Sequence, residues 1–98
     1  MVEEVKQQSK QVYIFQNTLY PIIKICISDN PSKRRTTVEN ASGFPLLLVY
    51  ESKPILNPIT VERLIHKRLD QYRQRGEWFT VDAESAKKEI EQIVNISE

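Results

Sequence analysis

The amino-acid sequence predicts a small α/β (α+β) domain, with a mainly antiparallel three-stranded sheet packed with helices in the order ββαβα(β)α. Runs of β-branched and aromatic residues dominate the first half of the chain, whereas apolar residues in the second half recur at three- and four-residue steps. The chain has 98 residues, the length of one small domain with a single core. We therefore expect a flexible N-terminal lead over residues 1–10 and one domain over residues 11–98.

The strands come first. Residues 12–15 and 20–27 are rich in β-branched and aromatic side chains, and the polar stretch 16–18 between them is typical of a turn, so the pattern predicts a β-hairpin. A third strand is expected over residues 44–51, and its apolar composition predicts that most of it is buried. Pro45 suits the start or the edge of that strand because it has no backbone N–H.

The first helix is expected from Pro31 to about Glu39. Asn30 can cap free backbone amides at the start of this helix, and proline is favoured at the first helical position because its missing N–H costs nothing there. Residues 40–43 should end the helix.

Two further helices are predicted in the second half of the chain. The first of them should begin after Thr60 as N-cap and stop before Gly76, with an apolar face made of Val61, Leu64, Ile65, Leu69 and Tyr72. The last helix should follow Asp82 as its cap and bury Ala86, Ile90, Ile93 and Val94. Residues 77–81, between these helices, read as a short strand over the core, in which Trp78 and Phe79 cover the helices rather than stack on bases.

The composition excludes several classes of protein. The most apolar window, residues 44–50, is far shorter than the roughly 20 residues of a membrane helix, and the start of the chain lacks the features of a signal peptide. We therefore expect a cytoplasmic protein. One cysteine and one histidine cannot complete a structural zinc site, and Cys26 lies in an apolar run that predicts a buried, unreactive side chain.

Charge is distributed unevenly along the chain. The net charge is +1, but residues 24–75 are basic and the segment from Gly76 onward is acidic. Such an asymmetry is typical of a surface that meets a polyanion, although mixed charges on helices are more often simply solvated.

Three motifs occur in a familiar order. Val12-Tyr13-Ile14 and Ile23-Lys24-Ile25-Cys26 fall on neighbouring strands, Asn30-Pro31-Ser32-Lys33-Arg34 opens a helix, and the segment 61–69 precedes Gly76-Glu77-Trp78-Phe79. Over residues 11–82 this order resembles the GIY-YIG nuclease superfamily, especially its short phage and bacterial branch.

The resemblance implies roles for four residues. Tyr13 matches the tyrosine that ends the first motif, and Arg34 matches the arginine of the Asn-Pro-x-x-Arg context. Glu62 matches the metal-binding glutamate, and His66 stands four residues after it, as in the family. Phosphodiester hydrolysis needs a group that activates water, a cation at the developing charge and a metal or acid at the leaving oxygen, and Tyr13, Arg34 and Glu62 supply one of each.

Each of these residues also has a simpler interpretation. Tyr13 would pack as a strand aromatic, Arg34 would be a solvated helix residue, and Glu62 would be a surface carboxylate favoured by the helix dipole in a first turn. His66 would be a hydrogen-bonding or exposed residue. The chain also departs from the family pattern, because Gln11 replaces the first glycine, and Ile23 and Cys26 replace the tyrosine and the glycine of the second motif.

The leading hypothesis is therefore a DNA endonuclease, weakened by these replacements, that uses one Mg²⁺ or Mn²⁺ ion held by Glu62, with Tyr13, Arg34 and His66 as catalytic residues. Its DNA-binding residues would be Lys24, Lys33, Arg35 and Lys67. The alternatives are a nucleic-acid-binding module on the same fold that no longer cuts, and a protein-interaction domain whose basic face is only solvated.

Overall fold

The computed structural model describes residues 10–96. The predicted N-terminal lead, residues 1–10, lies outside the described residues apart from Lys10. Along the chain the elements are β1 (Gln11–Asn17), β2 (Ile23–Ser28), α1 (Pro31–Ser42), β3 (Leu46–Glu51), α2 (Pro58–Arg68), the 3₁₀ helix η1 (Asp70–Tyr72), β4 (Arg73–Arg75), β5 (Trp78–Phe79) and α3 (Ala83–Ile96). The α+β class is confirmed.

The sheet has five strands rather than the three predicted. Their order is β3-β1-β2-β5-β4, and every neighbouring pair is antiparallel. The missed strand β4 consists of polar residues only, two of them exposed, so it carries no hydrophobic alternation that a sequence pattern could reveal. Strand β5 is confirmed, but only over Trp78 and Phe79.

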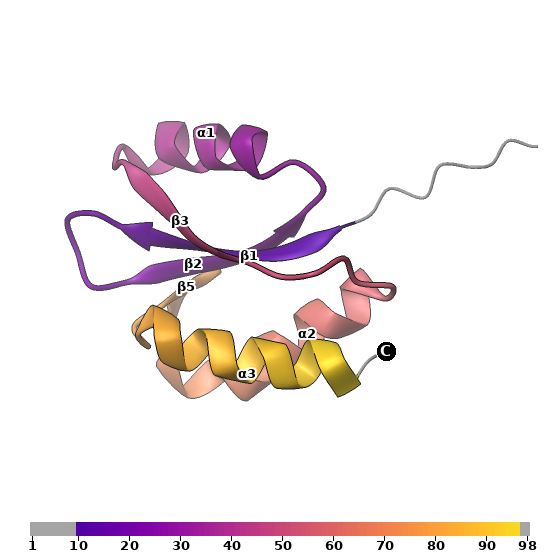
Figure 1. Ribbon diagram of the computed structural model, residues 1–98. Coiled ribbons are helices and arrows are strands. Elements are labelled where there is room, and N and C mark those ends of the chain that lie inside the picture. Colours follow the sequence, from indigo (N-terminus) through magenta and orange to yellow (C-terminus); the bar gives the residue numbers. More distant parts are fainter. Residues whose placement is uncertain (1–9, 97–98) are drawn as a thin grey trace, which may run out of the picture.

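Helices cover both faces of the sheet (Figure 1). Helix α1 lies over one face, and α2 and α3 lie side by side over the other. Successive residues of β1 point to opposite faces, so Val12 and Ile14 join the core under α2 and α3, whereas Tyr13 and Phe15 join a smaller core under α1. The domain is thus a three-layer arrangement with the sheet in the middle.

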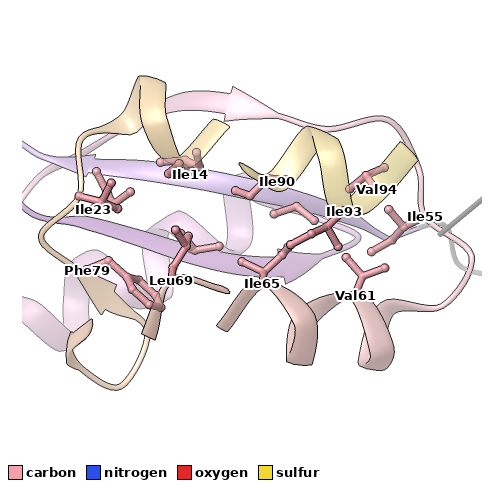
Figure 2. Packing of buried hydrophobic residues seen from close by; sticks show 14 residues of the cluster. Ile14, Ile23, Ile55, Val61, Ile65, Leu69, Phe79, Ile90, Ile93 and Val94 are labelled. Atoms are coloured by element: carbon pink, nitrogen blue, oxygen red, sulfur yellow. The ribbon is translucent and has the colours of Figure 1, made fainter. Parts of the chain in front are cut away.

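The larger core fills the space between the sheet and the helix pair α2 and α3 (Figure 2). The predicted stripe of α3 is confirmed, because all four of its residues are buried: Ala86, Ile90, Ile93 and Val94. From α2 only part of the predicted face is buried. Val61, Ile65 and Leu69 are in the core, whereas Leu64 is 43% exposed and Tyr72 is 39% exposed.

The N-terminal hairpin is confirmed, but its second strand begins at Ile23 rather than at Tyr20. The side chain of buried Asn17 explains the difference, because its Oδ1 accepts hydrogen bonds from the backbone N–H groups of Leu19 (2.8 Å) and Tyr20 (2.9 Å). These bonds hold residues 18–22 in a loop instead of a strand.

Strand β3 is not largely buried, so that prediction is wrong. Leu47 is 56% exposed and Val49 is 45% exposed. The reason is the position of β3 at the edge of the sheet, where it pairs only with β1. An apolar run indicates a strand, but it does not say whether the strand is central or at an edge.

Helix boundaries follow the capping chemistry only in part. Asn30 caps α1 as predicted, since its Oδ1 accepts from the N–H of Lys33 at 3.1 Å, but the helix continues to Ser42 and ends at Gly43, whose φ of 82° is left-handed. Asp82 accepts from the N–H of Ser85 at 3.0 Å and precedes α3, as predicted. The prediction of Thr60 as N-cap of α2 is wrong, because Asn57 precedes the helix and Pro58 takes its first position.

Two predictions about single side chains have different outcomes. Cys26 is buried, as expected. Trp78 was expected to cover the helix stripe, but it packs with the Tyr13 and Phe15 cluster on the α1 face of the sheet and is only half-buried. Its neighbour Phe79 points to the opposite face and does belong to the core under α2 and α3.

Among residues 10–96, no helix combines the length and the apolarity that crossing a membrane requires.

The packing of α3 can be tested with two isoleucines of the same helix. Ile90 has no exposed surface, so Ile90→Ala should leave a cavity and lower the free energy of unfolding by roughly 2–5 kcal/mol. Ile96 is 76% exposed, and Ile96→Ala should change that free energy by less than about 0.5 kcal/mol. Urea denaturation followed by circular dichroism measures both, and equal losses would contradict the described orientation of α3.

Candidate metal centre and the basic residues around it

The candidate site lies at a gap in the sheet, which is the place where β5 ends and β2 continues without a neighbouring strand on that side among the described residues. Strand β5 pairs with β2 only at Ile23 and Lys24, and the turn before β5 ends at Glu77, whose backbone oxygen accepts from the N–H of Ile25 at 3.1 Å. Gly76 supplies the left-handed φ of 56° that this turn requires. Because no strand pairs with β2 beyond this point among the described residues, the side chain of Glu77 can be reached from both faces of the sheet.

On the α1 side, two cations bind Glu77. Lys24 Nζ lies 3.4 Å from Glu77 Oε1, and Arg34 Nη2 lies 3.1 Å from the same oxygen. No residue within 10–96 makes a hydrogen bond or an ion pair with the other oxygen, Oε2. Glu77 is therefore anchored through one carboxylate oxygen, and the second oxygen is available.

On the α2 side, Glu77 meets Glu62 and His66. These two residues are four apart in α2, so their side chains lie on the same side of the helix. Glu62, His66 and Glu77 each offer one ligand atom within 4.8 Å of the others, and all three side chains are half-buried. Such a spacing allows one ion to contact all three groups.

The chemistry of this cluster fits a divalent cation. Nε2 of His66 is buried and has no hydrogen-bond partner among the described residues, which is a costly arrangement unless another group binds there. Two carboxylates and one imidazole are a donor set that Mn²⁺ accepts readily, while Mg²⁺ favours the oxygens. The position of Glu62 also overturns its simpler interpretation, because α2 begins at Pro58 and Glu62 lies in the second turn rather than the first.

Tyr13 lies in the core on the α1 side of the sheet. Its ring has no exposed surface, and its hydroxyl donates a hydrogen bond to Gln11 Oε1 at 3.3 Å. Burial, together with the charges of Glu51 and Asp29, raises the pKa of Tyr13 above its ordinary value. The hydroxyl therefore keeps its proton at neutral pH and can act as a donor, but it has not acquired the lowered pKa that a base would need.

Cys26 links Tyr13 to Arg34. It is the register partner of Tyr13 in the neighbouring strand. Burial raises the pKa of the Cys26 thiol, and Arg34 beside it opposes that effect. Burial also disfavours the charge of Arg34, but Cys26 and Glu77 next to it raise its pKa overall, so the guanidinium stays charged. Tyr13 is thus connected to Glu77 of the cluster only indirectly, through Cys26 and Arg34.

The four predicted DNA-binding residues do not share one surface. Lys24 is largely buried and engaged with Glu77 and with the ring of Trp78, 5.1 Å from its Nζ. Lys33 and Arg35 are exposed on α1. Lys67 is exposed on α2, where it lines a groove toward α3 together with Ile93.

Sequence reasoning missed one residue of the cluster, Glu77. It lies in the Gly-Glu-Trp-Phe segment that carried part of the resemblance, but no role had been assigned to it. Arg75 was also missed. Its register partner is Trp78, after a register shift between Arg73 and Arg75, and only the pairing of the unpredicted strand β4 brings it beside Trp78.

Comparison with known proteins identifies one family. A family model described as the T5orf172 domain matches residues 10–95. The chain has no significant match among curated proteins or solved structures. Membership of the GIY-YIG superfamily, predicted from the motif order, is wrong, because the matching model is that of the T5orf172 domain. This family is associated with nuclease-like or DNA-binding function, which agrees with the broader expectation of a role on nucleic acid.

The cluster predicts a measurable metal affinity. Mn²⁺ should bind more tightly than Mg²⁺, because the imidazole nitrogen suits the transition metal better. Glu62→Gln and Glu77→Gln should each lower Mn²⁺ affinity, measured by isothermal titration calorimetry, by on the order of 10- to 100-fold. Glu84→Gln, which removes an exposed carboxylate of α3 outside the cluster, is the matched control and should bind as the wild type does. Unchanged affinity in both cluster variants would exclude this metal centre.

Proposed function

This chain belongs to the T5orf172 domain family, and on that premise we propose that it is a slow, divalent-metal-dependent DNA endonuclease that hydrolyses phosphodiester bonds. The observation that carries the proposal is the cluster of Glu62, His66 and Glu77, in which a buried imidazole nitrogen has no partner among the described residues and a carboxylate oxygen is unused. In the reaction, the oxygen of a water molecule attacks phosphorus and that water gives up a proton, while the bond to the leaving oxygen breaks and the leaving oxygen takes up a proton.

Glu62, His66 and Glu77 would hold one Mg²⁺ or Mn²⁺ ion. When bound, such an ion supplies Lewis-acid polarisation of the phosphoryl group. The same two carboxylates bring negative charge to the gap in the sheet, and Lys24 and Arg34 balance it. This balance allows the half-buried charges to coexist in the folded protein.

Arg34 is the residue best suited to the phosphate. Its guanidinium is charged, it contacts Glu77 through Nη2 only, and its Nε is buried without a hydrogen-bond partner in the described part of the chain. A guanidinium can donate two parallel hydrogen bonds to phosphate oxygens, which stabilises the charge that develops during transfer. His66, beside Glu62, would either ligate the ion or accept a proton.

Tyr13 contributes as a buried donor in this proposal. With its raised pKa it stays protonated, so it orients neighbouring groups and does not remove a proton from water. Cleavage is therefore expected to be slow.

The same features favour a second candidate, a DNA-binding module that no longer cuts. The specific observation is that burial raises the pKa of Tyr13 rather than lowering it. Both candidates bind DNA and differ only in turnover, so one cleavage experiment separates them.

Cleavage should depend on Glu62. Purified protein is incubated with end-labelled duplex, branched and single-stranded DNA, with Mg²⁺, with Mn²⁺ or with EDTA, and the products are separated on a denaturing gel. We expect slow cleavage with either metal and none with EDTA, and Glu62→Gln should reduce it by about 10²- to 10³-fold.

The controls for this experiment are Glu84→Gln, which should cut as the wild type does, and circular dichroism of Glu62→Gln, which should be unchanged. Binding without cleavage on all three DNAs would establish the module that no longer cuts. Wild-type cleavage rates in Glu62→Gln would show that Glu62 is not part of the active centre.

DNA binding should depend on salt through the exposed basic residues of α1. Lys33→Gln combined with Arg35→Gln should reduce the slope of log affinity against log salt by up to about 2, because each lost phosphate contact removes about 0.9. Fluorescence anisotropy with labelled duplex DNA at several salt concentrations measures the slope. Lys88→Gln, on the acidic helix α3, is the control and should leave the slope unchanged. Salt-independent binding would favour the interaction-domain alternative.

A further inference from the structure

A hollow next to the metal cluster has the chemistry of a nucleobase site. Its volume is about 390 Å³, within the roughly 300–1,000 Å³ range of small-molecule pockets. It lies between the end of α1, the β1–β2 loop and strand β4. Its lining includes the aromatic rings of Phe44 and Trp78 and the polar side chains of Ser42, Gln74 and Arg75.

Helix α1 buries one residue against the sheet, and Trp78 is only half-buried. The buried residue of α1, Val38, packs against Tyr13, Phe15 and Cys26. The strand pairing places Lys24, Trp78 and Arg75 in one row across β2, β5 and β4, with a register shift in β4 just before Arg75. Trp78 and Arg75 both line the hollow. The row is an aromatic ring with a cation on each side, an arrangement that suits a base and its phosphate.

The walls of the hollow are held in place by contacts of their own. The ring of Phe44 meets that of Tyr20 edge-on, with the centroids 5.4 Å apart, and the Phe44 N–H donates to Ser42 Oγ at 3.3 Å. Both hydrogen bonds accepted by Asn17 Oδ1 fix the β1–β2 loop. A site that is already formed binds without the entropic cost of ordering its walls.

Two polar side chains of the hollow are unused. Within residues 10–96, the side chains of Gln74 and Arg75 make no hydrogen bond, ion pair or ring contact. An amide offers both a donor and an acceptor to the edge of a base, and a guanidinium offers paired donors to a phosphate. An apolar peptide would use neither group, so the charge and the polar groups favour a nucleotide.

We propose that this hollow binds one unpaired nucleobase of the DNA, stacked against Phe44 and Trp78, with the adjoining phosphate held by Arg75. The proposal rests on the proposed function, because the DNA must also reach the metal cluster. Trp78 follows Glu77 directly in the chain, and Lys24 contacts both residues. The base site and the metal cluster therefore adjoin, and DNA with an unpaired base near the cleaved bond would occupy both.

The test compares two DNAs in EDTA, so that catalysis plays no part. One is a fully paired duplex, and the other carries a single unpaired 5-iodouracil at the same position. Fluorescence anisotropy gives the two affinities, and ultraviolet crosslinking followed by mass spectrometry gives the residue that contacts the iodouracil. The wild type should bind the second DNA roughly 5- to 150-fold more tightly, which is the range expected for stacking of one base.

The variants are Phe44→Leu and Arg75→Gln. Phe44→Leu should abolish most of this preference and Arg75→Gln should reduce it, while both keep wild-type affinity for the paired duplex to within a few-fold. Leu19→Ala removes another exposed apolar side chain of the β1–β2 loop, 64% exposed, and should keep the preference. The crosslink should map to Phe44 or to residues 74–78.

The failures of the two proposals look different. A wild type that binds both DNAs equally, or a crosslink that maps outside the hollow, overturns the base site and leaves metal-dependent cleavage of duplex DNA intact. A wild type that binds neither DNA overturns the proposed function and the base site together.

Discussion

The carboxylate of Glu77 connects the two halves of this domain. On one face of the sheet it binds Lys24 and Arg34, and on the other it lies within 4.8 Å of Glu62 and His66. A side chain can do this only where the sheet is interrupted, and the interruption follows from the short β5 and the turn at Gly76. Without that gap, the five-stranded sheet would separate the α1 side from the α2 side.

Where side-chain periodicity decides the structure, the sequence was sufficient. The buried stripe of α3, the cap at Asn30 and the N-terminal hairpin follow from local chemistry, and the structure has them as expected. Where the position of an element in the fold decides the structure, the sequence was not sufficient. The exposure of β3 depends on its place at the sheet edge, and the existence of β4 depends on pairing with β5 rather than on its own polar residues.

The residues of the candidate site show the same difference between local pattern and position in the fold. Glu62 and His66 were recognisable because a four-residue spacing places them on one side of a helix. Glu77 was not, because only a turn between two very short strands brings it to them. The motif order included Cys26 and Glu77, which lie beside Arg34, although the family it indicated was not the one that matches. Spacing along the chain thus predicted that Glu62 and His66 lie together, but it did not predict the family.

Charge and hydrogen bonding give different results at this site. Glu77 binds both cations, Lys24 and Arg34, and Glu62 lies close to Glu77, so two carboxylates are matched by two cations and the formal charges cancel. The hydrogen bonding, in contrast, is incomplete. In residues 10–96 two buried side-chain nitrogens have no partner, Nε2 of His66 and Nε of Arg34, and both belong to residues that lie against Glu77. Each such atom costs about 1–3 kcal/mol. In the proposed function, a bound ion on the side of His66 and a bound phosphate on the side of Arg34 would supply the missing partners.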